Sequence, residues 1–309
     1  MRVLVTGATG FIGSALVRDL VQDGRFSLRA ATRRDVPVLA GVERVVVGDF
    51  AATADWHDAV AGVDVVVHLA GLAHVRSGDR REAKAFEEIN AVAATKLARQ
   101  AAQYGVSRFV FLSSIKVHGE EGSFSEEDRL SPGDGYATSK ALAEKSLGDV
   151  ASSMGMELVI IRPPLVYGDG AKANFDLLAG AIRSGVPLPL GGISNRRSLV
   201  ALENVIDFIR LAIDHPAAAN QAFLVSDAED LSTSELVRRI ARAMDKPARL
   251  FWIPPRLVSL VSRSFGRPEF AQRLLGSLWI SSSKAERVLG WSAPFSVDDA
   301  LRRTFANSR

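Results

Sequence analysis

The stretch Val3-Leu4-Val5-Thr6-Gly7-Ala8-Thr9-Gly10-Phe11-Ile12-Gly13 decides the fold of this chain. A short apolar run comes before a glycine turn, and residues with helical spacing follow it. The pattern predicts a buried strand, a tight turn and the start of a helix. Glycine lets backbone N–H groups approach a phosphate, and the helix N-terminus then faces its charge. We therefore expect Gly7, Gly10, Phe11, Ile12 and Gly13 to bind the pyrophosphate of a dinucleotide.

The first half of the chain alternates between strand and helix patterns. Near-continuous Val, Ile and Leu runs are typical of parallel strands that are covered on both faces. The expected strands are residues 2–6, 28–32, 44–47, 64–69, 108–112 and 157–161, and the expected helices are 11–22, 82–104 and 136–154. This order predicts an α/β fold with a doubly wound parallel (Rossmann) sheet, whose ligands lie beyond the carboxyl ends of the strands.

The rhythm changes after Arg162-Pro163-Pro164, where short apolar pieces, prolines and glycines follow. A helix at 203–214 and a strand at 222–225 are expected to return to the main sheet. Residues 1–162 with 201–225 are therefore predicted to form the dinucleotide-binding domain. Residues 163–200 with 226–309 are predicted to form a smaller C-terminal substrate lobe.

Composition excludes several kinds of site. The 309 residues are 47% hydrophobic and carry a net charge of +3 without a dense basic cluster, which argues against nucleic acid as a partner. The absence of cysteine excludes disulfides and thiolate chemistry, and no histidine spacing suggests a metal site. A strand from residue 2 leaves no room for a secretory signal, and no apolar run reaches the roughly 20 residues of a membrane span. We expect a cytoplasmic protein without membrane insertion.

The strand ends supply the remaining cofactor contacts. Enzymes that prefer NAD commonly carry an acidic residue after the second strand, whereas this chain has Arg33-Arg34, which could bind a 2′-phosphate. The pattern favours NADP(H) and leaves NAD(H) open. Asp49 and Phe50 after the third strand are expected to contact the adenine. Leu69, Ala70 and Gly71 offer small or apolar residues where the cofactor backbone passes.

A second motif, Tyr136-Ala137-Thr138-Ser139-Lys140, predicts the reacting centre. Tyr136 and Lys140 share a helix face, and a nearby ammonium is expected to lower the pKa of the phenol. Tyr136 could then act as general acid towards a ketone or as general base towards an alcohol. Ser114, just past the fifth strand, could orient the same substrate oxygen. With a dinucleotide site in place, these residues predict hydride transfer at a carbinol or ketone carbon.

The full set of motifs resembles the extended short-chain dehydrogenase/reductase family, of the NAD-dependent epimerase/dehydratase type, over nearly the whole chain. The matching residues are Thr6 to Gly13, His68-Leu69-Ala70, Asn90, Ser113-Ser114, Tyr136 to Lys140 and Arg162-Pro163. The resemblance implies catalytic roles for Ser114, Tyr136 and Lys140, and cofactor contacts from Asn90 and Pro163. It also implies a UDP-binding lobe, and a homodimer formed through helices 82–104 and 136–154.

The resemblance extends to candidate substrate contacts. Asn174 and Arg197 match positions that bind the diphosphate in such enzymes, and Arg273 is a weaker match for a second arginine. Leu188 and Leu190 match the stretch whose backbone pairs with uracil. From the residues themselves, His74 could line the sugar pocket. Lys116 could stabilise a developing alkoxide on the sugar.

Within the family, the residues after Ser114 separate the possible reactions. No Asp-Glu pair follows Ser114, so a 4,6-dehydratase is rejected. Residues 113–120 and 195–200 resemble 4-ketoreductases of UDP-linked 4-keto-6-deoxy-N-acetylhexosamines, which serve O-antigen and lipopolysaccharide biosynthesis. Arg33-Arg34 suggests an exchanging cofactor such as NADPH, which a reductase needs, and a reductase is the leading interpretation. The alternatives are a UDP-hexose or UDP-N-acetylhexosamine 4-epimerase with tightly bound NAD, and a non-catalytic NADP-binding regulator.

Overall fold

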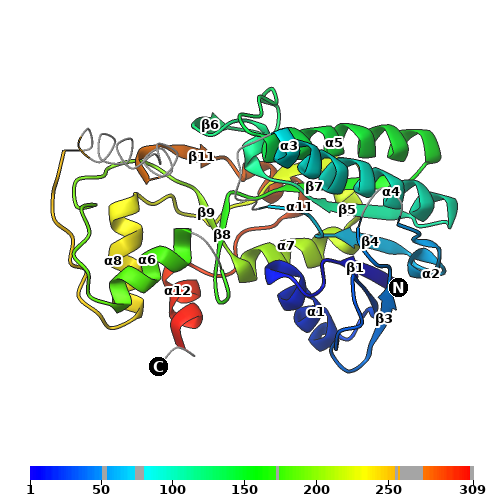
Figure 1. Ribbon diagram of the computed structural model, residues 1–309, viewed down its shortest axis with the longest axis horizontal. Helices are drawn as coiled ribbons and strands as arrows, with labels where there is room; N and C mark the ends of the chain where they lie inside the picture. Colours follow the sequence, from blue (N-terminus) through cyan, green and yellow to red (C-terminus); the bar gives the residue numbers. More distant parts are fainter. Residues whose placement is uncertain (51–53, 74–79, 172–173, 255–256, 258–273, 307–309) are drawn as a thin grey trace.

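The computed structural model describes residues 1–50, 54–73, 80–171, 174–254, 257 and 274–306. Its centre is a seven-stranded parallel sheet in the order β10-β7-β5-β4-β1-β2-β3 (Figure 1). The strands are β1 (Arg2–Thr6), β2 (Ser27–Thr32), β3 (Val42–Val46), β4 (Val65–His68), β5 (Arg108–Leu112), β7 (Glu157–Arg162) and β10 (Gln221–Leu224). The predicted doubly wound sheet is confirmed. Its order reverses between β1 and β4, and ligands of such sheets bind beyond the carboxyl ends at that point.

Helices cover both faces of the sheet (Figure 1). The helices α1 (Phe11–Asp23) and α7 (Leu202–Asp214) lie on one face, and α4 (Ala93–Gln103) and α5 (Gly135–Met154) lie on the other. Each layer has its own apolar core, and the two cores are separated by the sheet. The buried residues of α4 recur at helical spacing, so that one face of the helix is covered. Most of them are alanines, and these small side chains allow α4 and α5 to pack closely.

The long helix predicted over residues 82–104 is not a single α-helix. The segment consists of α3 (Arg80–Phe86), the π-helical segment η1 (Glu87–Val92) and α4. Such wide turns occur mostly at functional sites. Here the π-helical segment contains Asn90, which is buried next to the loop after β4. An Ala-rich pattern with helical period does not distinguish the two helix types, so the sequence could not predict this segment.

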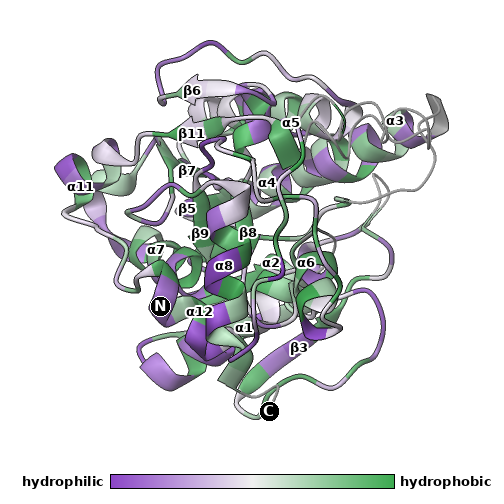
Figure 2. Cartoon of the chain, turned by 90° about the vertical axis from the view of Figure 1, so that its left-hand side faces the viewer, coloured by the Kyte–Doolittle hydropathy of each residue, from purple (hydrophilic) through white to green (hydrophobic). Residues whose placement is uncertain are grey.

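The smaller lobe has a separate core. The helices α6 (Asn174–Arg183), α8 (Thr233–Ala243) and α12 (Val297–Ala306) surround it, next to a two-stranded parallel sheet of β8 (Leu165–Tyr167) and β9 (Leu199–Ala201). The ring of Phe175 packs between those of Tyr167 and Phe305, at centroid distances of 5.7 and 6.0 Å. In Figure 2, where this lobe faces the viewer, α8 carries both hydrophilic and hydrophobic residues, as its amphipathic pattern predicts.

Residues 283–291, before α12, return to the main domain, which differs from the predicted division. Strand β11 (Leu278–Ile280) pairs with β6 (Gly122–Phe124), and α11 (Ser283–Leu289) packs against β10. Trp291 belongs to the main core, and its indole N–H donates to Asp207 Oδ2 at 2.8 Å. Residues 283–291 were expected in the smaller lobe. They pack on the main domain because Trp291 covers Phe208, at a ring centroid distance of 5.0 Å.

The described part of the chain contains neither a membrane-spanning helix nor a metal-binding cluster. None of the helices there combines the length and the apolar character that a bilayer span requires. No group of three or more His, Cys, Asp or Glu side chains in the same residues is arranged to bind a metal ion.

Candidate active site

The glycine turn after β1 leaves the N-terminus of α1 open. Gly10 is the N-cap and provides no side chain, and the first turn of α1 contains no acidic residue. A Cβ on Gly7 would lie 2.7 Å from the Ala70 nitrogen, and one on Gly13 would lie 2.1 Å from the Gly7 carbonyl oxygen. Only glycine fits at either position. The uncapped N–H groups suit the pyrophosphate of a dinucleotide, as the sequence predicts.

Asn90 supports the loop that follows β4. Its Oδ1 accepts from the Leu72 N–H at 2.8 Å, and its Nδ2 donates to the Leu72 carbonyl at 3.0 Å and to Ser139 Oγ at 2.9 Å. A Cβ on Gly71 would lie 3.0 Å from Asn90 Oδ1 and 3.4 Å from Lys140 Nζ. The structure therefore brings the loop residues, Asn90 and Lys140 together at the carboxyl end of the sheet. Direct cofactor contacts by Leu69, Ala70 and Asn90 stay a prediction.

The predicted reacting residues also meet at this end of the sheet. Ser114 follows β5, and its hydroxyl lies close enough to the Tyr136 phenol to lower the pKa of that phenol. Helix α5 begins at Gly135, because Asp134 caps it by accepting from the Ala137 N–H at 2.7 Å. The Phe86 ring stands edge-on to Tyr136, at a centroid distance of 5.9 Å. Two segments thus bring these residues together: Ser114 follows β5, and Tyr136 and Lys140 both lie on α5.

Burial dominates the protonation of this centre. It raises the pKa of Tyr136 to about 12, although the nearby Ser114 hydroxyl lowers it in part. Burial also lowers the pKa of Lys140 to about 8, against the opposing effect of Glu144. The expectation that Lys140 lowers the pKa of Tyr136 is therefore not what the structure shows. In the protein alone, the pKa of the phenol is set by desolvation, with smaller effects from Ser114 and Asp134.

Lys140 is enclosed by groups at the ends of β4 and β5. Its ammonium donates to the Leu112 carbonyl at 2.9 Å and lies 4.6 Å from the centre of the Phe111 ring. His68 is fully enclosed nearby and shares a 2.8 Å hydrogen bond with Thr6 Oγ1. Burial and the charge of Lys140 lower the pKa of His68 to about 3. His68 is therefore neutral at ordinary pH and does not act as an acid towards substrate.

A buried ion pair behind the centre was missed by the sequence reasoning. Arg162 at the end of β7 donates to both carboxylate oxygens of Glu144, at 2.6 and 3.0 Å, and lies 2.9 Å from His118 Nε2. Glu144 lies one turn beyond Lys140 on α5, so the pair joins that helix to the sheet. An acidic residue four positions after Lys140, on a buried helix face, was the available signal.

The Lys116 ammonium is bound by two carboxylates. It donates to Asp134 Oδ2 at 2.6 Å and to Glu120 Oε1 at 2.9 Å. Burial lowers the pKa of Lys116, but these two hydrogen bonds outweigh it and raise the pKa on balance. Both carboxylates already neutralise the cation, and its contact with a sugar alkoxide stays a prediction.

Two candidate uracil contacts also have other partners. The Leu188 N–H donates to the Arg249 carbonyl at 2.8 Å, and its carbonyl accepts from the Phe251 N–H at 3.1 Å. The Leu190 carbonyl accepts from the hydroxyl of Ser234. These groups therefore serve the packing of the smaller lobe, and backbone pairing with uracil stays a prediction.

Arg197, a candidate diphosphate contact, is half-buried at the edge of the smaller lobe. Its guanidinium donates to the Gly276 carbonyl at 3.1 Å. Its backbone forms bridges with Leu231 and Leu278. The side chain is thus fixed between segments of the lobe, and its predicted contact with a diphosphate stays a prediction.

The remaining candidate residues differ in how exposed they are, and some lie outside the described residues. Arg33 and Arg34 are exposed after β2, Asp49 is exposed after β3, and the Phe50 ring lies 5.0 Å from that of Trp56. Pro163 is buried, and its carbonyl accepts from the Ile115 N–H at 3.0 Å. Asn174 begins α6, but its side chain is outside the description. His74 and Arg273 lie outside the described residues.

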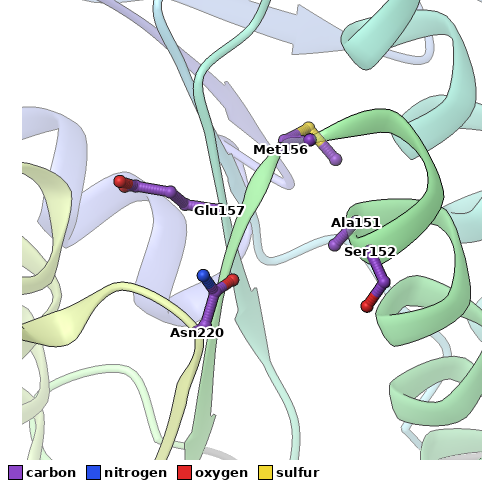
Figure 3. A pocket seen from close by; sticks show the side chains of 6 residues that line it. Ala151, Ser152, Met156, Glu157 and Asn220 are labelled. Atoms are coloured by element: carbon purple, nitrogen blue, oxygen red, sulfur yellow. The ribbon is translucent and has the colours of Figure 1, made fainter.

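A surface pocket at the other end of the sheet is unrelated to this centre. Figure 3 shows it at the amino ends of β7 and β10, next to the end of α5. Its lining residues are Ala151, Ser152, Gly155, Met156, Glu157 and Asn220. None of them is a sequence-predicted site residue. The predicted catalytic residues lie instead at the carboxyl ends of the strands.

Comparison with known proteins identifies relatives along the full chain. The sequence pattern of the NAD dependent epimerase/dehydratase family matches residues 3–226. The chain is 42% identical over 310 residues to the UDP-glucose 4-epimerase of Vibrio cholerae, covering 98% of this chain and 94% of that protein.

Solved structures show the same fold. The UDP-N-acetylglucosamine 4-epimerase from Bacillus cereus superimposes with a TM-score of 0.82 at 20% identity, covering 100% of this chain and 99% of that chain. The UDP-glucuronic acid 4-epimerase from Bacillus cereus, solved in complex with NAD, gives a TM-score of 0.81 at 20% identity, covering 99% and 96%. At this identity the likeness concerns the fold.

Proposed function

Because the chain belongs to the NAD dependent epimerase/dehydratase family, we propose that it is a UDP-sugar 4-epimerase. The observation that carries this proposal is its 42% identity to the Vibrio cholerae UDP-glucose 4-epimerase along 98% of the chain. The meeting of Ser114, Tyr136 and Lys140 at the carboxyl end of the sheet supports it. This proposal replaces the 4-ketoreductase that the residues after Ser114 first suggested.

The chain supplies the groups that such a reaction needs. The glycine turn and the open N-terminus of α1 would bind the pyrophosphate of NAD, and Lys140, which lies close to Gly71, would bind its ribose. When bound, NAD would supply reversible hydride acceptance at the sugar C4. Tyr136 would take the proton of the C4 hydroxyl and give it back, and Ser114 would orient that oxygen. The smaller lobe would bind the UDP part.

A second candidate is a 4-ketoreductase that uses NADPH. It is favoured by one observation: Arg33 and Arg34 are exposed after β2, where an acidic residue would suit NAD. The argument from Lys116 no longer supports it, because Asp134 and Glu120 bind that ammonium. Roles in O-antigen or lipopolysaccharide synthesis, and a homodimer, stay predictions.

The test follows product formation with two kinds of substrate. Purified protein is incubated with UDP-glucose or UDP-N-acetylglucosamine without added cofactor, and the products are separated by chromatography. We expect interconversion with the C4 epimers, and its loss in Tyr136→Phe. A protein that leaves both sugars unchanged, but oxidises NADPH with a UDP-4-keto-6-deoxy-N-acetylhexosamine, would instead be the reductase. Inactivity in both assays, with the dinucleotide bound, would favour a regulator.

The cofactor is tested separately. We expect NAD or NADH to be released when the purified protein is denatured, since an epimerase retains its cofactor through the cycle. Calorimetry on the stripped protein should give NADH an affinity at least equal to that of NADPH. If NADPH binds tenfold more tightly and Arg33→Ala removes the difference, the arginine pair binds a 2′-phosphate and the reductase gains support.

A further inference from the structure

An ion-pair cluster joins the two segments that carry the reacting hydroxyls. Lys116 lies in the short 3-10 helix η2 (Ile115–Val117), which begins directly after Ser114. Asp134 is the N-cap of α5, two residues before Tyr136. One carboxylate oxygen of Asp134 accepts from the Ala137 N–H at 2.7 Å, and the other accepts from Lys116 Nζ at 2.6 Å. A single carboxylate thus contacts both segments.

We propose that Lys116 is a positioning residue, which acts through Asp134 to fix the start of the Tyr136 helix against the segment that carries Ser114. The proposal rests on the epimerase function proposed above. Its geometric basis is that the Lys116–Asp134 ion pair spans the segment that carries Ser114 and the helix start that carries Tyr136. Losing the pair would let the two hydroxyls separate, although neither hydroxyl is itself changed.

The contacts of Lys116 with Asp134 and Glu120 suit a structural role better than substrate binding. Lys116 and its two partners are each about one third exposed, and Glu120 lies against the backbone of Gly133. Ser114 Oγ also accepts from the Lys116 N–H at 3.3 Å, so the backbone of Lys116 and its side chain brace both hydroxyl-bearing segments. A sugar alkoxide would have to compete with two carboxylates for this ammonium.

The pair also controls the charge next to Tyr136. Among the described groups, Ser114 and Asp134 are those that act on the pKa of the phenol besides burial, and Asp134 raises it. Asp134 and Glu120 in turn raise the pKa of Lys116. Removing the Lys116 charge leaves the Asp134 carboxylate without its cation, which favours the neutral phenol. Removing the Asp134 charge favours the phenolate, so the two changes shift the pKa of Tyr136 in opposite directions.

The experiment is a double-mutant cycle on steady-state epimerisation. The variants are Lys116→Met, Asp134→Asn and the double variant, with Lys116→Arg as the charge-conserving variant. Asparagine remains a good N-cap, so Asp134→Asn changes the ion pair more than the helix start. Lys145→Met is the matched control, since Lys145 is exposed on the same helix.

We expect Lys116→Met to lower kcat by about 10- to 100-fold, with KM for the UDP-sugar changed less than about twofold. Lys116→Arg should recover most of the loss, and the double variant should be no slower than the slower single variant. If the Tyr136 phenolate is the base, kcat rises with pH as the phenol loses its proton. This rise should move to higher pH in Lys116→Met and to lower pH in Asp134→Asn. Additive losses, or a KM effect that persists in the Asp134→Asn background, would overturn the proposal and make Lys116 a sugar ligand.

A second readout does not depend on the epimerase activity. The chain has 3 tyrosines, so 13C-labelled tyrosine gives few NMR signals, and Tyr136→Phe assigns that of Tyr136. The Tyr136 signal should shift away from its wild-type position in Lys116→Met. It should stay near that position in Lys116→Arg and in the control Lys145→Met. An unshifted signal in Lys116→Met overturns the positioning role even if the wild-type protein epimerises no UDP-sugar. A shifted signal in an inactive wild type would leave the positioning intact and reject only the function.

Discussion

Tyr136 and Lys140 lie on one face of α5, yet burial drives both towards their neutral forms. The pKa of Tyr136 rises to about 12, and that of Lys140 falls to about 8. At pH 7 the phenol is therefore neutral, whereas the Lys140 amine is still mostly protonated and becomes neutral only above about pH 8. A bound cationic nicotinamide ring would favour the phenolate, so the base form is expected to depend on the cofactor.

Replacing Tyr136 by phenylalanine removes the proposed proton carrier and keeps the ring against Phe86. Turnover of the UDP-sugar should fall by at least about 10²-fold, because general acid–base catalysis contributes that much or more. The measurement is the initial epimerisation rate at saturating substrate. Tyr104→Phe is the control, since Tyr104 is 42% exposed, and it should retain the wild-type rate. Comparable rates for the two variants would reject the proposed mechanism.

Lys140→Met should stabilise the cofactor-free protein while it abolishes turnover. The folded pKa of Lys140 is about 8 and its ordinary value is 10.5, so the unfolded chain binds the extra proton between these values. Wild-type stability therefore rises with pH across this window, and the burial penalty is fully present below pH 8. At pH 7 the variant should melt about 2–6 °C higher, after the lost Leu112 hydrogen bond is allowed for.

The pH dependence separates this effect from ordinary repacking. The gap in Tm between Lys140→Met and wild type should narrow as the pH rises from about 8 to 10.5. Lys145→Met, an exposed change on the same helix, should show no such narrowing. A gap that stays constant with pH would mean that Lys140 carries no burial penalty.

At the scale of elements, the first residues of the helices position the groups of the candidate site. Helix α1 starts without a side-chain cap and leaves its N–H groups to a ligand, whereas α5 starts with the Asp134 cap, which accepts from the Ala137 N–H. The π-helical turn of η1 aims Asn90 at the loop after β4. Each of these differences follows from one or two residues at an element boundary.

The glycine turn gives the prediction that belongs to this scale. A Cβ on Gly13 would lie 2.1 Å from the Gly7 carbonyl oxygen, so Gly13→Ala must displace the turn. Dinucleotide affinity, measured by calorimetry, should fall at least about tenfold, and Tm should fall. Gly148→Ala is the matched control, because a Cβ there meets nothing within 4 Å inside α5. It should raise stability by up to about 1 kcal/mol, which is the helix preference of alanine over glycine.

Across the whole molecule, the two lobes are joined by a buried polar network. Tyr167 in β8 donates to Asp227 Oδ2 at 2.7 Å, and Asp227 Oδ1 accepts from the Ala201 N–H and from Asn204 Nδ2 at 2.9 and 2.7 Å. Asp227 follows β10 of the main sheet, whereas Tyr167 and Ala201 lie in the small sheet of the other lobe. Burial raises the pKa of Asp227, and these donors oppose that rise.

Tyr167→Phe tests this connection. The change leaves Asp227 Oδ2 buried without its donor, and such a loss costs about 1–3 kcal/mol. Urea unfolding should show this decrease in the free energy of unfolding, whereas Tyr104→Phe should be within about 0.5 kcal/mol of wild type. An unchanged unfolding midpoint for Tyr167→Phe would show that the network adds nothing to the joining of the lobes.

The sequence alone determined the parallel sheet, the glycine turn before α1 and the shared face of Tyr136 and Lys140. These depend on apolar periodicity and on neighbours within one or two turns of the chain, which are visible in the order of residues. The tertiary structure decided the rest. Lys116 meets Asp134 from 18 positions away, and the Leu188 backbone pairs with residues around Leu250. The protonation of Tyr136 and Lys140 depends on how completely water is excluded, and only the packing of distant segments sets that.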